Sequence, residues 1–434
     1  MTAIIALIKS IESQLKMEGR KHLKIWLLIA FAIETLCATY FLKLQVLAGF
    51  ASILYFLSGI GIAVIILFLP KAKNPAFNVS SSYQNYFRFF LIASIAVFLY
   101  WLSNSIINEN SLDFHNADML PVIKKMDQRF LNGQWKHVYD NIPELWNGTQ
   151  PIYLPAMWVP FAPAVALNID VRWITVACLF FVFAATTLIL SFKQKSSYII
   201  LLIAGILLCW LLLEDDTHSL ISFSEEGPVV LHYFLLVFAL VSENIFFIGI
   251  AACLCMLSRY SLVGWLPAFF IFLLINKKNK QAFIFTFLGM LSFLFLFIIP
   301  FGWDAFLHFL QLPNQYIDFS KIVWRDSPEV FLDNLGFAKF FEADRMNVLH
   351  LLLIGFTFII PSAFILFCNY YTKKKSLSNI PLAALKIALV IFYNFIDVPY
   401  LYLFYTSTVV SLAIVAIFMN ENNCNGDFQS LTAN

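Results

Sequence analysis

Charged side chains are scarce in this sequence. Only 12% of its 434 residues are Asp, Glu, Lys or Arg, whereas 61% are hydrophobic, and the mean hydropathy is +0.79. A soluble globular domain carries about twice that share of charge, so the composition excludes the soluble classes. The net charge of +2, without a stripe of basic residues, also excludes a DNA or RNA partner. Such a composition is typical of a polytopic membrane protein whose main solvent is lipid.

Metal-binding cysteine patterns are lacking as well. The seven cysteines fall almost entirely within apolar runs and include no CxxC pair, so no zinc-type spacing is present. Cys253 and Cys255 are two positions apart, and a helix would point their thiols about 200° apart. We therefore interpret the cysteines as small hydrophobic residues. We expect no metal site and no cofactor, while the sequence leaves a divalent cation open.

Long charge-free runs are present instead. Residues 44–70 and 281–300 contain no formal charge, and about 20 apolar residues are enough to cross a bilayer as a helix. Runs of this kind predict an all-α integral membrane protein with about 11 to 13 transmembrane or re-entrant helices. No cleavable signal peptide is expected, because the first apolar run begins only at Ile25. The expected organisation is a cytoplasmic amphipathic segment (1–24), a single membrane domain (25–419) and a disordered cytoplasmic tail (420–434).

Lysine-rich loops set the expected orientation, because such loops favour the cytoplasmic side. They occur in four places: before residue 25, and at 71–73, 277–280 and 373–375. With these loops inside, the polar segments 108–150 and 302–345 share the outer face. Lys193 and Lys195 fit the cytoplasm only if residues 151–167 do not cross the membrane. We predict that this segment is re-entrant or half-length, because its four prolines remove backbone donors.

A polar segment at residues 108–150 interrupts the apolar runs. From Asp118 onward it has the pattern of a helix, with Asp118 as the N-cap, apolar residues at helical spacing and Gly133 placed to end it. Such a helix would lie flat on the membrane, with Lys124 and Arg129 facing water or lipid phosphate. Asp118 then has two interpretations. It is a plain helix cap, or it is a carboxylate held above the bilayer as general base for an acceptor hydroxyl.

The order of features in this region resembles a known fold. An early outer-loop Asp is followed by "LNG", "VYD" and a Pro- and aromatic-rich return to the membrane, "PIYLPAMWVPFAP". Later come "SENIFFIGIAACLCMLSRYSLVGWLPAFF", "NKKNK" and a loop that opens with "FGWDAFLHFL". This order, over residues 110–345, resembles the GT-C fold glycosyltransferases, particularly the polyprenol-phosphate-mannose-dependent class related to glycosyltransferase family 87. The sequence departs from that pattern in having a hairpin of two spans before the expected first helix.

The resemblance implies a membrane hexosyltransferase. Its members transfer a sugar, typically mannose in this class, from a polyprenyl-phosphate donor to an acceptor hydroxyl, with inversion, at the outer face of the membrane. The acceptor would be a glycan or glycolipid of the cell envelope, and the site would face the periplasm from a bacterial inner membrane. By position, the family's general base corresponds to Asp118, with Asp113 as the fallback. His115 and Tyr139, the latter in "VYD", are further candidates for contact with substrate.

A phosphate leaving group needs positive charge directed at it. The candidates are Lys124, Lys125 and Arg129 in the first outer loop, and Lys321 and Arg325 in the second. We favour Arg325, because a guanidinium can bind phosphate in a bidentate manner. The alternative is that Arg325 is a surface charge paired with Asp326 or Glu329.

Three polar residues lie in or between apolar runs. Glu34 is in the middle of the first span, where an unpaired charge costs about 2.5–3.5 kcal/mol on insertion scales. It must therefore be protonated, paired within the bundle, or functional. Glu243 and Asn244 separate two apolar runs. A helix cap explains this pair, and a contact with a sugar hydroxyl is the functional alternative that the resemblance suggests.

Other classes of membrane protein remain as alternatives. A solute transporter or lipid flippase without glycosyl transfer would also have many spans and broken helices, but it predicts inverted repeats and midplane charges, and we find no internal repeat. A non-catalytic scaffold does not require two polar loops on one face. An O-antigen ligase or polymerase would place arginines and a histidine in its large outer loop rather than an early Asp. We rank the glycosyltransferase first and the transporter second.

Overall fold

The structure is a computed structural model. It describes residues 2–41, 48–72, 82–112, 119–145, 148–192, 194–213, 220–222, 224–371 and 379–420. Helices form most of these residues, and an isolated bridge between Ile142 and Thr149 is the only β pairing within them. The prediction of an all-α protein is therefore confirmed. Residues 420–434 were predicted to form a disordered tail. Of these, Asn420 is described, and its side chain donates to the carbonyl of Ile189 at 2.7 Å, while residues 421–434 lie outside the described residues.

The helices follow one another with short connections. In chain order they are α1 (Thr2–Ala38), α2 (Ala48–Phe68), α3 (Ser82–Glu109), α4 (Met119–Leu131), η2 (Trp135–His137), α5 (Pro155–Trp158), η3 (Val159–Phe161), α6 (Ala162–Ala166), α7 (Arg172–Ile189), α8 (Lys195–Leu213), α9 (Glu226–Ser242), α10 (Ile245–Met256), η4 (Tyr260–Leu262), α11 (Trp265–Ile275), α12 (Asn279–Phe293), η5 (Leu294–Ile298), α13 (Ile299–Asp326), α14 (Glu329–Leu332), η6 (Phe337–Phe340), η7 (Ala343–Arg345), α15 (Met346–Tyr371), α16 (Ile380–Phe395) and α17 (Leu401–Met419).

Seven helical stretches among the described residues are long and apolar enough to cross a membrane. They are Gly49–Phe68, Tyr83–Glu109, Arg172–Ile189, Lys195–Leu213, Asn279–Pro313, Ala343–Tyr370 and Leu401–Met419. Shorter apolar helices of 10–17 residues lie beside them, including α9, α10 and α16. This composition supports a membrane-embedded protein with several spans.

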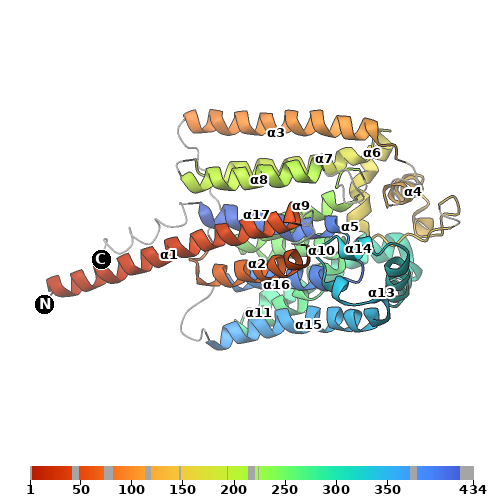
Figure 1. The fold of residues 1–434 in the computed structure, drawn as a ribbon. Helices are drawn as coiled ribbons and strands as arrows, with labels where there is room; N and C mark the ends of the chain where they lie inside the picture. Colours follow the sequence, from red (N-terminus) through yellow and green to blue (C-terminus); the bar gives the residue numbers. More distant parts are fainter. Residues whose placement is uncertain are drawn as a thin grey trace.

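Helix α17 forms the centre of the bundle (Figure 1). Every residue of it is buried, and it packs against α1, α7, α8, α9 and α16. Its sequence, "LYLFYTSTVVSLAIVAIFM", is rich in small and β-branched residues, which let neighbouring helix backbones approach closely. The other helices surround it, and α3 lies at the edge of the bundle (Figure 1).

Polar contacts join the helix ends at one end of the bundle, which we call the lysine end. Lys71, after α2, forms an ion pair of 2.6 Å with Glu243, after α9. The Asn379 side chain, before α16, donates hydrogen bonds to the carbonyls of Ile66, Leu69 and Pro70 at the end of α2. The last carbonyls of a helix lack the full set of backbone donors that its interior has, so Asn379 acts as a cap supplied by another helix.

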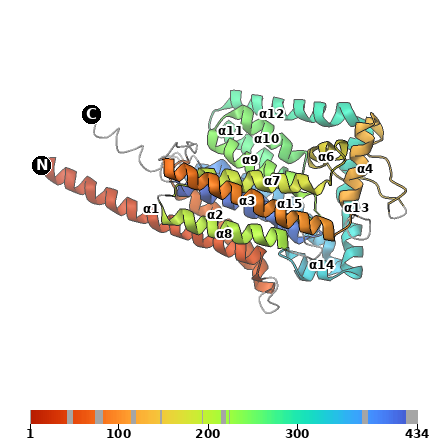
Figure 2. The same cartoon turned by 90° about the horizontal axis from the view of Figure 1, so that it is seen from above.

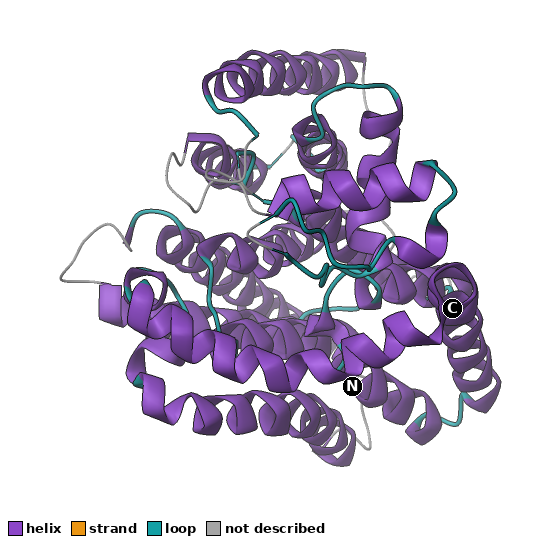
Figure 3. Ribbon diagram, turned by 90° about the vertical axis from the view of Figure 1, so that its right-hand side faces the viewer, coloured by secondary structure: helices purple, strands orange, loops and turns teal. Residues whose placement is uncertain are grey.

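The opposite end, which we call the loop end, gathers the other helix termini. The amide of Ala156 donates to the carbonyl of Leu257, after α10, at 2.9 Å. Arg172, at the start of α7, donates to the carbonyls of Ile107 and Asn110 at the end of α3. Figure 3 views the molecule from this end, where loops and short helices gather.

The proline-rich segment 151–167 does not cross the bundle. It forms the fragments α5, η3 and α6, which together run only from Pro155 to Ala166. Ala156 near its start and Arg172 shortly after its end both bind partners at the loop end. The segment is therefore half-length, one of the two forms predicted for it, and α7 begins at the loop end.

Two amphipathic helices lie across the loop end, α4 and α13 (Figure 2). The chain bends within α13, near its start, at Gly302, which has a φ of 87°, a conformation that L side chains rarely adopt. The Tyr139 ring, after α4, packs edge-on against Phe301 and Phe309 of α13, with ring centroids 5.3 Å apart in each case. The two long polar loops of the sequence therefore contact each other.

Candidate functional site

The helix expected after Asp118 is present. Helix α4 runs from Met119 to Leu131, and Gly133 follows it with a φ of 76°. Its apolar face is buried, with Ile123 and Met126 fully inside, while Lys124 is exposed. The structure thus confirms the helix and its end. The three predicted residues before it, Asp113, His115 and Asp118, lie outside the described residues.

Arg129 organises the loop that follows α4. Its guanidinium donates hydrogen bonds to the backbone carbonyls of His137, Val138, Asp140 and Asn141, at 2.6–3.4 Å. The sequence predicted that the Arg129 side chain would face water or lipid phosphate. In the structure the guanidinium binds four carbonyls instead. Arg129 therefore holds the 132–141 loop against α4.

Tyr139 is buried rather than open to a substrate. Its hydroxyl donates to the carbonyl of Tyr153 and accepts from the indole Nε1 of Trp158, both at 3.1 Å. Its ring packs against Phe297, Phe301 and Phe309. The structure therefore gives Tyr139 a place in the aromatic core that joins the two polar loops.

The basic candidates of the second loop lie in the last two turns of α13. Lys321 is 3.5 Å from Asp318, one turn earlier. Arg325 is exposed and forms no ion pair or hydrogen bond with any described residue. Its expected alternative, pairing with Asp326 or Glu329, is therefore not observed. Of the basic candidates, Arg325 and Lys124 have uncommitted charged groups.

Glu243 and Asn244 belong to the lysine end, far from the other candidates. Glu243 ends α9 in a left-handed conformation, and the Asn244 side chain caps α10 by accepting from the Phe246 amide. Helix α9 has 17 residues, which corresponds to about 25 Å at 1.5 Å per residue. The helix-cap interpretation is confirmed, and the structure separates this pair from any site formed by the two polar loops.

A carboxylate cluster lies at the loop end. Glu225 and Glu226, at the start of α9, both form ion pairs with the Arg259 guanidinium that follows α10. The Glu225 to Arg259 distance is 2.7 Å, and the hydroxyl of Thr406 on α17 donates to Glu226 at 3.2 Å. Both glutamates are almost fully buried, while the Arg259 side chain is 19% exposed. With two carboxylates and one guanidinium, this cluster carries net negative charge when all three groups are ionised.

Tyr402 connects the carboxylate cluster to the start of α4. Its hydroxyl donates to the sulfur of Met119 at 3.1 Å, and it lies close enough to interact with the charges of Glu225 and Arg259. Met119 is the first residue of α4, so the start of that helix lies beside this contact. Four segments that are distant in sequence, 119, 225–226, 259 and 402–406, therefore meet at one place.

A buried histidine and aspartate form a second polar group at the loop end. His350, in the second turn of α15, donates from Nδ1 to Asp397 Oδ2 at 2.6 Å. Asp397 lies in the elbow between α16 and α17, which we define as residues 396–400. The residues are 6% and 4% exposed. In such an arrangement a carboxylate fixes the tautomer and the orientation of the imidazole, which leaves Nε2 for other chemistry.

No protein-family model, curated protein or solved structure matches this chain. Conclusions about its chemistry therefore rest on the residues and their geometry. Within the described part of the chain, no three His, Cys, Asp or Glu side chains are grouped as they would be around a metal ion. The loop end combines instead a carboxylate cluster, a histidine and aspartate pair, and exposed basic groups.

Sequence reasoning did not single out most of this site. Glu225 and Glu226 stand out as a polar "SEEG" stretch directly before an apolar run, which is a usable signal. Arg259 follows an apolar run, and "SRY" gives no sign of its partners. His350 and Asp397 each interrupt apolar surroundings without a motif, and their separation of 47 residues hides the pair.

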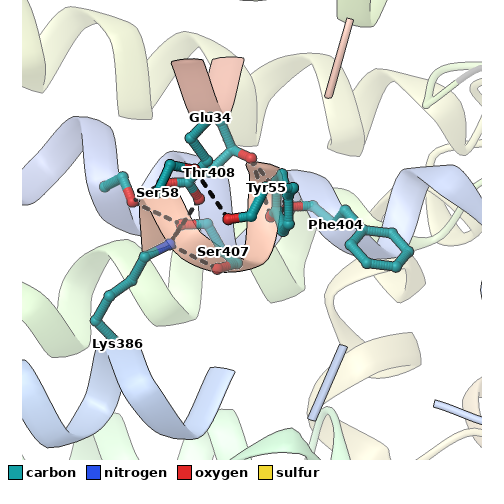
Figure 4. A network of polar contacts seen from close by, with 8 residues as sticks. Glu34, Tyr55, Ser58, Lys386, Phe404, Ser407 and Thr408 are labelled. Carbon is teal, nitrogen blue, oxygen red and sulfur yellow. Dashed lines mark hydrogen bonds and ion pairs between the residues drawn. The ribbon is translucent and has the colours of Figure 1, made fainter. Parts of the chain in front are cut away.

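A third polar network is buried in the bundle between α1, α2, α16 and α17 (Figure 4). The Lys386 ammonium lies 2.6 Å from Glu34 and also donates to the carbonyl and hydroxyl of Ser407. The Ser411 hydroxyl donates to the second Glu34 oxygen at 2.7 Å. Both charged residues are fully buried. Of the three interpretations of Glu34, the structure therefore supports pairing within the bundle.

Asp127 of α4 is a buried carboxyl group outside the spans. It is completely buried, and neither oxygen has a hydrogen-bond partner among the described residues. Burial raises its pKa to about 8, because a charged carboxylate is disfavoured away from water. Its protonated form is therefore the one that fits the packing between α4 and α6.

This burial predicts a pH-dependent stability. Between the ordinary pKa of 3.8 and about 8, the unfolded chain has lost the Asp127 proton while the folded chain keeps it. Stability must therefore fall as pH rises through this window and level off above it. Between pH 5 and pH 9 we expect a loss on the order of 4 kcal/mol from this group, measured as unfolding of the detergent-solubilised protein.

The variant Asp127→Asn should lack this component of the pH dependence, since an amide does not titrate. Asp140→Asn, which removes an exposed carboxylate of the same loop, is the matched control and should keep the wild-type slope. If Asp127→Asn retains that slope, another group is responsible for it.

Proposed function

We propose that the chain is a membrane glycosyltransferase that moves a hexose, mannose in type, from a polyprenyl-phosphate sugar to an acceptor hydroxyl. The observation that carries this proposal is the meeting point at Tyr402. There Met119, the first residue of α4 and the one that follows Asp118 in the sequence, contacts Tyr402 beside the buried carboxylate cluster. A carboxylate positioned rigidly by a helix start is suited to accept a proton from a hydroxyl. The order of sequence features similar to GT-C enzymes supports the same chemistry.

The proposed arrangement in the membrane is GT-C-like. The seven long spans, the apolar half of α1 and the shorter helices α9, α10, α11 and α16 would cross, and α5 to α6 would be re-entrant, within the range of about 11 to 13 expected from sequence. The lysine end would face the cytoplasm. The loop end would then face the outside, which is the periplasm for a bacterial inner membrane, where a lipid-linked donor and an envelope glycan or glycolipid can both reach it.

The proposed reaction is a single displacement. The acceptor oxygen attacks the anomeric carbon, the bond from that carbon to the phosphate oxygen breaks, and the electron pair leaves with polyprenyl phosphate. Asp118, or Asp113 in its place, takes the hydroxyl proton. Arg325 and Lys124, whose charged groups are uncommitted, and Lys321 stabilise the phosphate. The anomeric configuration inverts, because attack and departure occur on opposite faces.

The direct test is transfer by the purified protein in lipid vesicles. A panel of radiolabelled polyprenyl-phosphate hexoses is supplied with a membrane extract as acceptor, and the anomeric configuration of the product is determined. We expect transfer from one donor, with inversion. No transfer from any donor overturns the proposal, and retention of configuration overturns its single-displacement mechanism.

One observation favours a second candidate function, a lipid or solute transporter. The Glu34 and Lys386 pair is a buried charge pair within the bundle, and charges at that depth often belong to transport pathways. Vesicles that exchange a fluorescent polyprenyl-phosphate lipid between leaflets only when they contain the protein would support this function. Loss of that exchange in a variant that still transfers sugar would show that the two activities are separate.

A further inference from the structure

The histidine and aspartate pair lies beneath the second polar loop. An apolar cluster of Phe331, Ala338, Met346, Leu349 and Val398, which we call the lid cluster, holds that loop against the bundle. His350 directly follows Leu349, and Asp397 directly precedes Val398. A β-carbon at Gly336, before η6, would overlap Pro399 of the elbow, so the loop backbone touches the elbow itself.

The phosphate candidate Arg325 belongs to the same corner of the molecule. Trp324, its neighbour in the chain, packs on the lid cluster, with its ring 4.5 Å from that of Phe331. Arg325 and the His350–Asp397 pair are thus attached to one apolar cluster. The carboxylate cluster lies apart from them, at the other end of the segment 397–402, where the stacked rings of Tyr400 and Tyr402 are 5.5 Å apart.

The imidazole of His350 has one nitrogen available. Nδ1 is held by Asp397, and Nε2 has no hydrogen-bond partner among the described residues. Asp397 Oδ1 is buried without a partner in the described part of the chain, so its negative charge acts mainly on the imidazole. A carboxylate at one nitrogen stabilises an imidazolium that donates from the other.

We propose that His350 is the proton donor to the leaving phosphate, and that Asp397 positions it. This inference rests on the proposed function. A sugar-linked phosphodiester carries one negative charge, and breaking its bond to the anomeric carbon creates a phosphate monoester whose second pKa is about 6. An imidazolium held in this position can give its Nε2 proton to that group as it leaves.

The protons balance in this scheme. His350 gives the Nε2 proton to the departing phosphate oxygen, and Asp118 takes the proton of the acceptor hydroxyl. Solvent then restores both groups. The carboxylates of Glu225 and Glu226 would repel the negatively charged phosphate, whereas Arg325 attracts it. This difference favours the phosphate on the Arg325 side of the site.

The test compares two donors in wild type and His350→Gln. One is the natural polyprenyl-phosphate hexose, and the other carries two fluorines on the prenyl carbon next to the ester oxygen, which makes the leaving phosphate less dependent on a proton. We expect His350→Gln to be about 100-fold slower than wild type with the natural donor. With the fluorinated donor the deficit should shrink to below about tenfold.

The matched control is His232→Gln, which removes another buried histidine, from α9, and should leave both rates close to wild type. Asp397→Asn should follow His350→Gln in its dependence on the donor. An equal deficit with both donors indicates a merely structural role and overturns the proposal, as does a His350→Gln rate equal to wild type. If wild type moves no sugar at all, the proposed function fails first.

A second measurement covers the case in which the variants do not fold. Diethylpyrocarbonate modifies accessible imidazole nitrogens, and mass spectrometry locates the adduct in the wild-type protein. Addition of polyprenyl phosphate should protect His350 and leave His137, an exposed histidine of the first loop, unprotected. Unchanged modification of His350 at saturating polyprenyl phosphate would overturn its contact with the leaving group.

Discussion

Asp118→Asn is expected to slow sugar transfer about a thousandfold, while leaving donor binding intact. Removing a general base costs about 10²–10⁴ in rate, because the acceptor hydroxyl then loses its proton only to water. An amide of the same size can still cap α4, so the helix should remain. The measurement is the initial rate of transfer from the active donor in lipid vesicles, together with donor binding by filtration.

Two further variants make this result specific. Asp318→Asn removes an exposed carboxylate of α13 whose side chain is 82% accessible, and it should transfer at the wild-type rate. Asp113→Asn tests the fallback position. If Asp113→Asn loses activity and Asp118→Asn does not, the base is Asp113 and Asp118 is only a helix cap. If both variants are as fast as wild type, neither carboxylate is the base.

Lys386→Met is expected to destabilise the bundle by about 3–5 kcal/mol, the typical cost of removing one partner from a buried ion pair. The variant leaves the Glu34 carboxylate without its cation, 2.6 Å from where the ammonium lies, at a place without access to water. Methionine has nearly the same length, so the loss reports the charge rather than a cavity. Unfolding in mixed micelles with increasing sodium dodecyl sulfate measures it.

The sequence offers a matched control for this experiment. The Lys71 and Glu243 pair has the same 2.6 Å separation, but its side chains are 53% and 48% exposed, so Glu243→Gln should cost at most about 1 kcal/mol. The double variant Glu34→Gln with Lys386→Met should recover much of the stability, because no charge is left unpaired. If Lys386→Met is no less stable than Glu243→Gln, burial does not govern the strength of this pair.

Local features of the fold were predictable from sequence. The start of α4 after Asp118 and its end before Gly133 follow from capping rules that depend on a few neighbouring residues. The broken helix at 155–166 follows from its prolines, which prevent a continuous run of backbone hydrogen bonds. Each of these predictions depended on residues within one or two helical turns. The structure contains both predicted features.

The polar partners were not predictable, because they are far apart in the chain. Glu34 and Lys386 are separated by 352 residues, and nothing in either apolar run indicates the other. The pairing depends on the packing of both α1 and α16 against α17. Among many apolar helices of similar composition, periodicity does not select which neighbours meet.

Glu243 and Asn244 show a second reason why positions in the fold were hard to predict from the sequence. Their polar character at a break between apolar runs correctly indicated a helix boundary. Their placement with the outer-loop residues followed from the resemblance, and it depended on how many times the chain crosses between residues 151 and 243. The structure has α7, α8 and α9 in that interval, so the pair falls at the lysine end.

Four polar contacts of the bundle depend on the position of α17 along its own axis. Tyr402 reaches Met119, Thr406 reaches Glu226, Ser407 reaches Lys386 and Asn420 reaches the end of α7. Inserting one residue in the elbow would rotate every later position by about 100° and advance it by about 1.5 Å. All of these partners would be lost together. The elbow length therefore sets, in one step, the rotation of α17 at both the carboxylate cluster and the buried Glu34 and Lys386 pair.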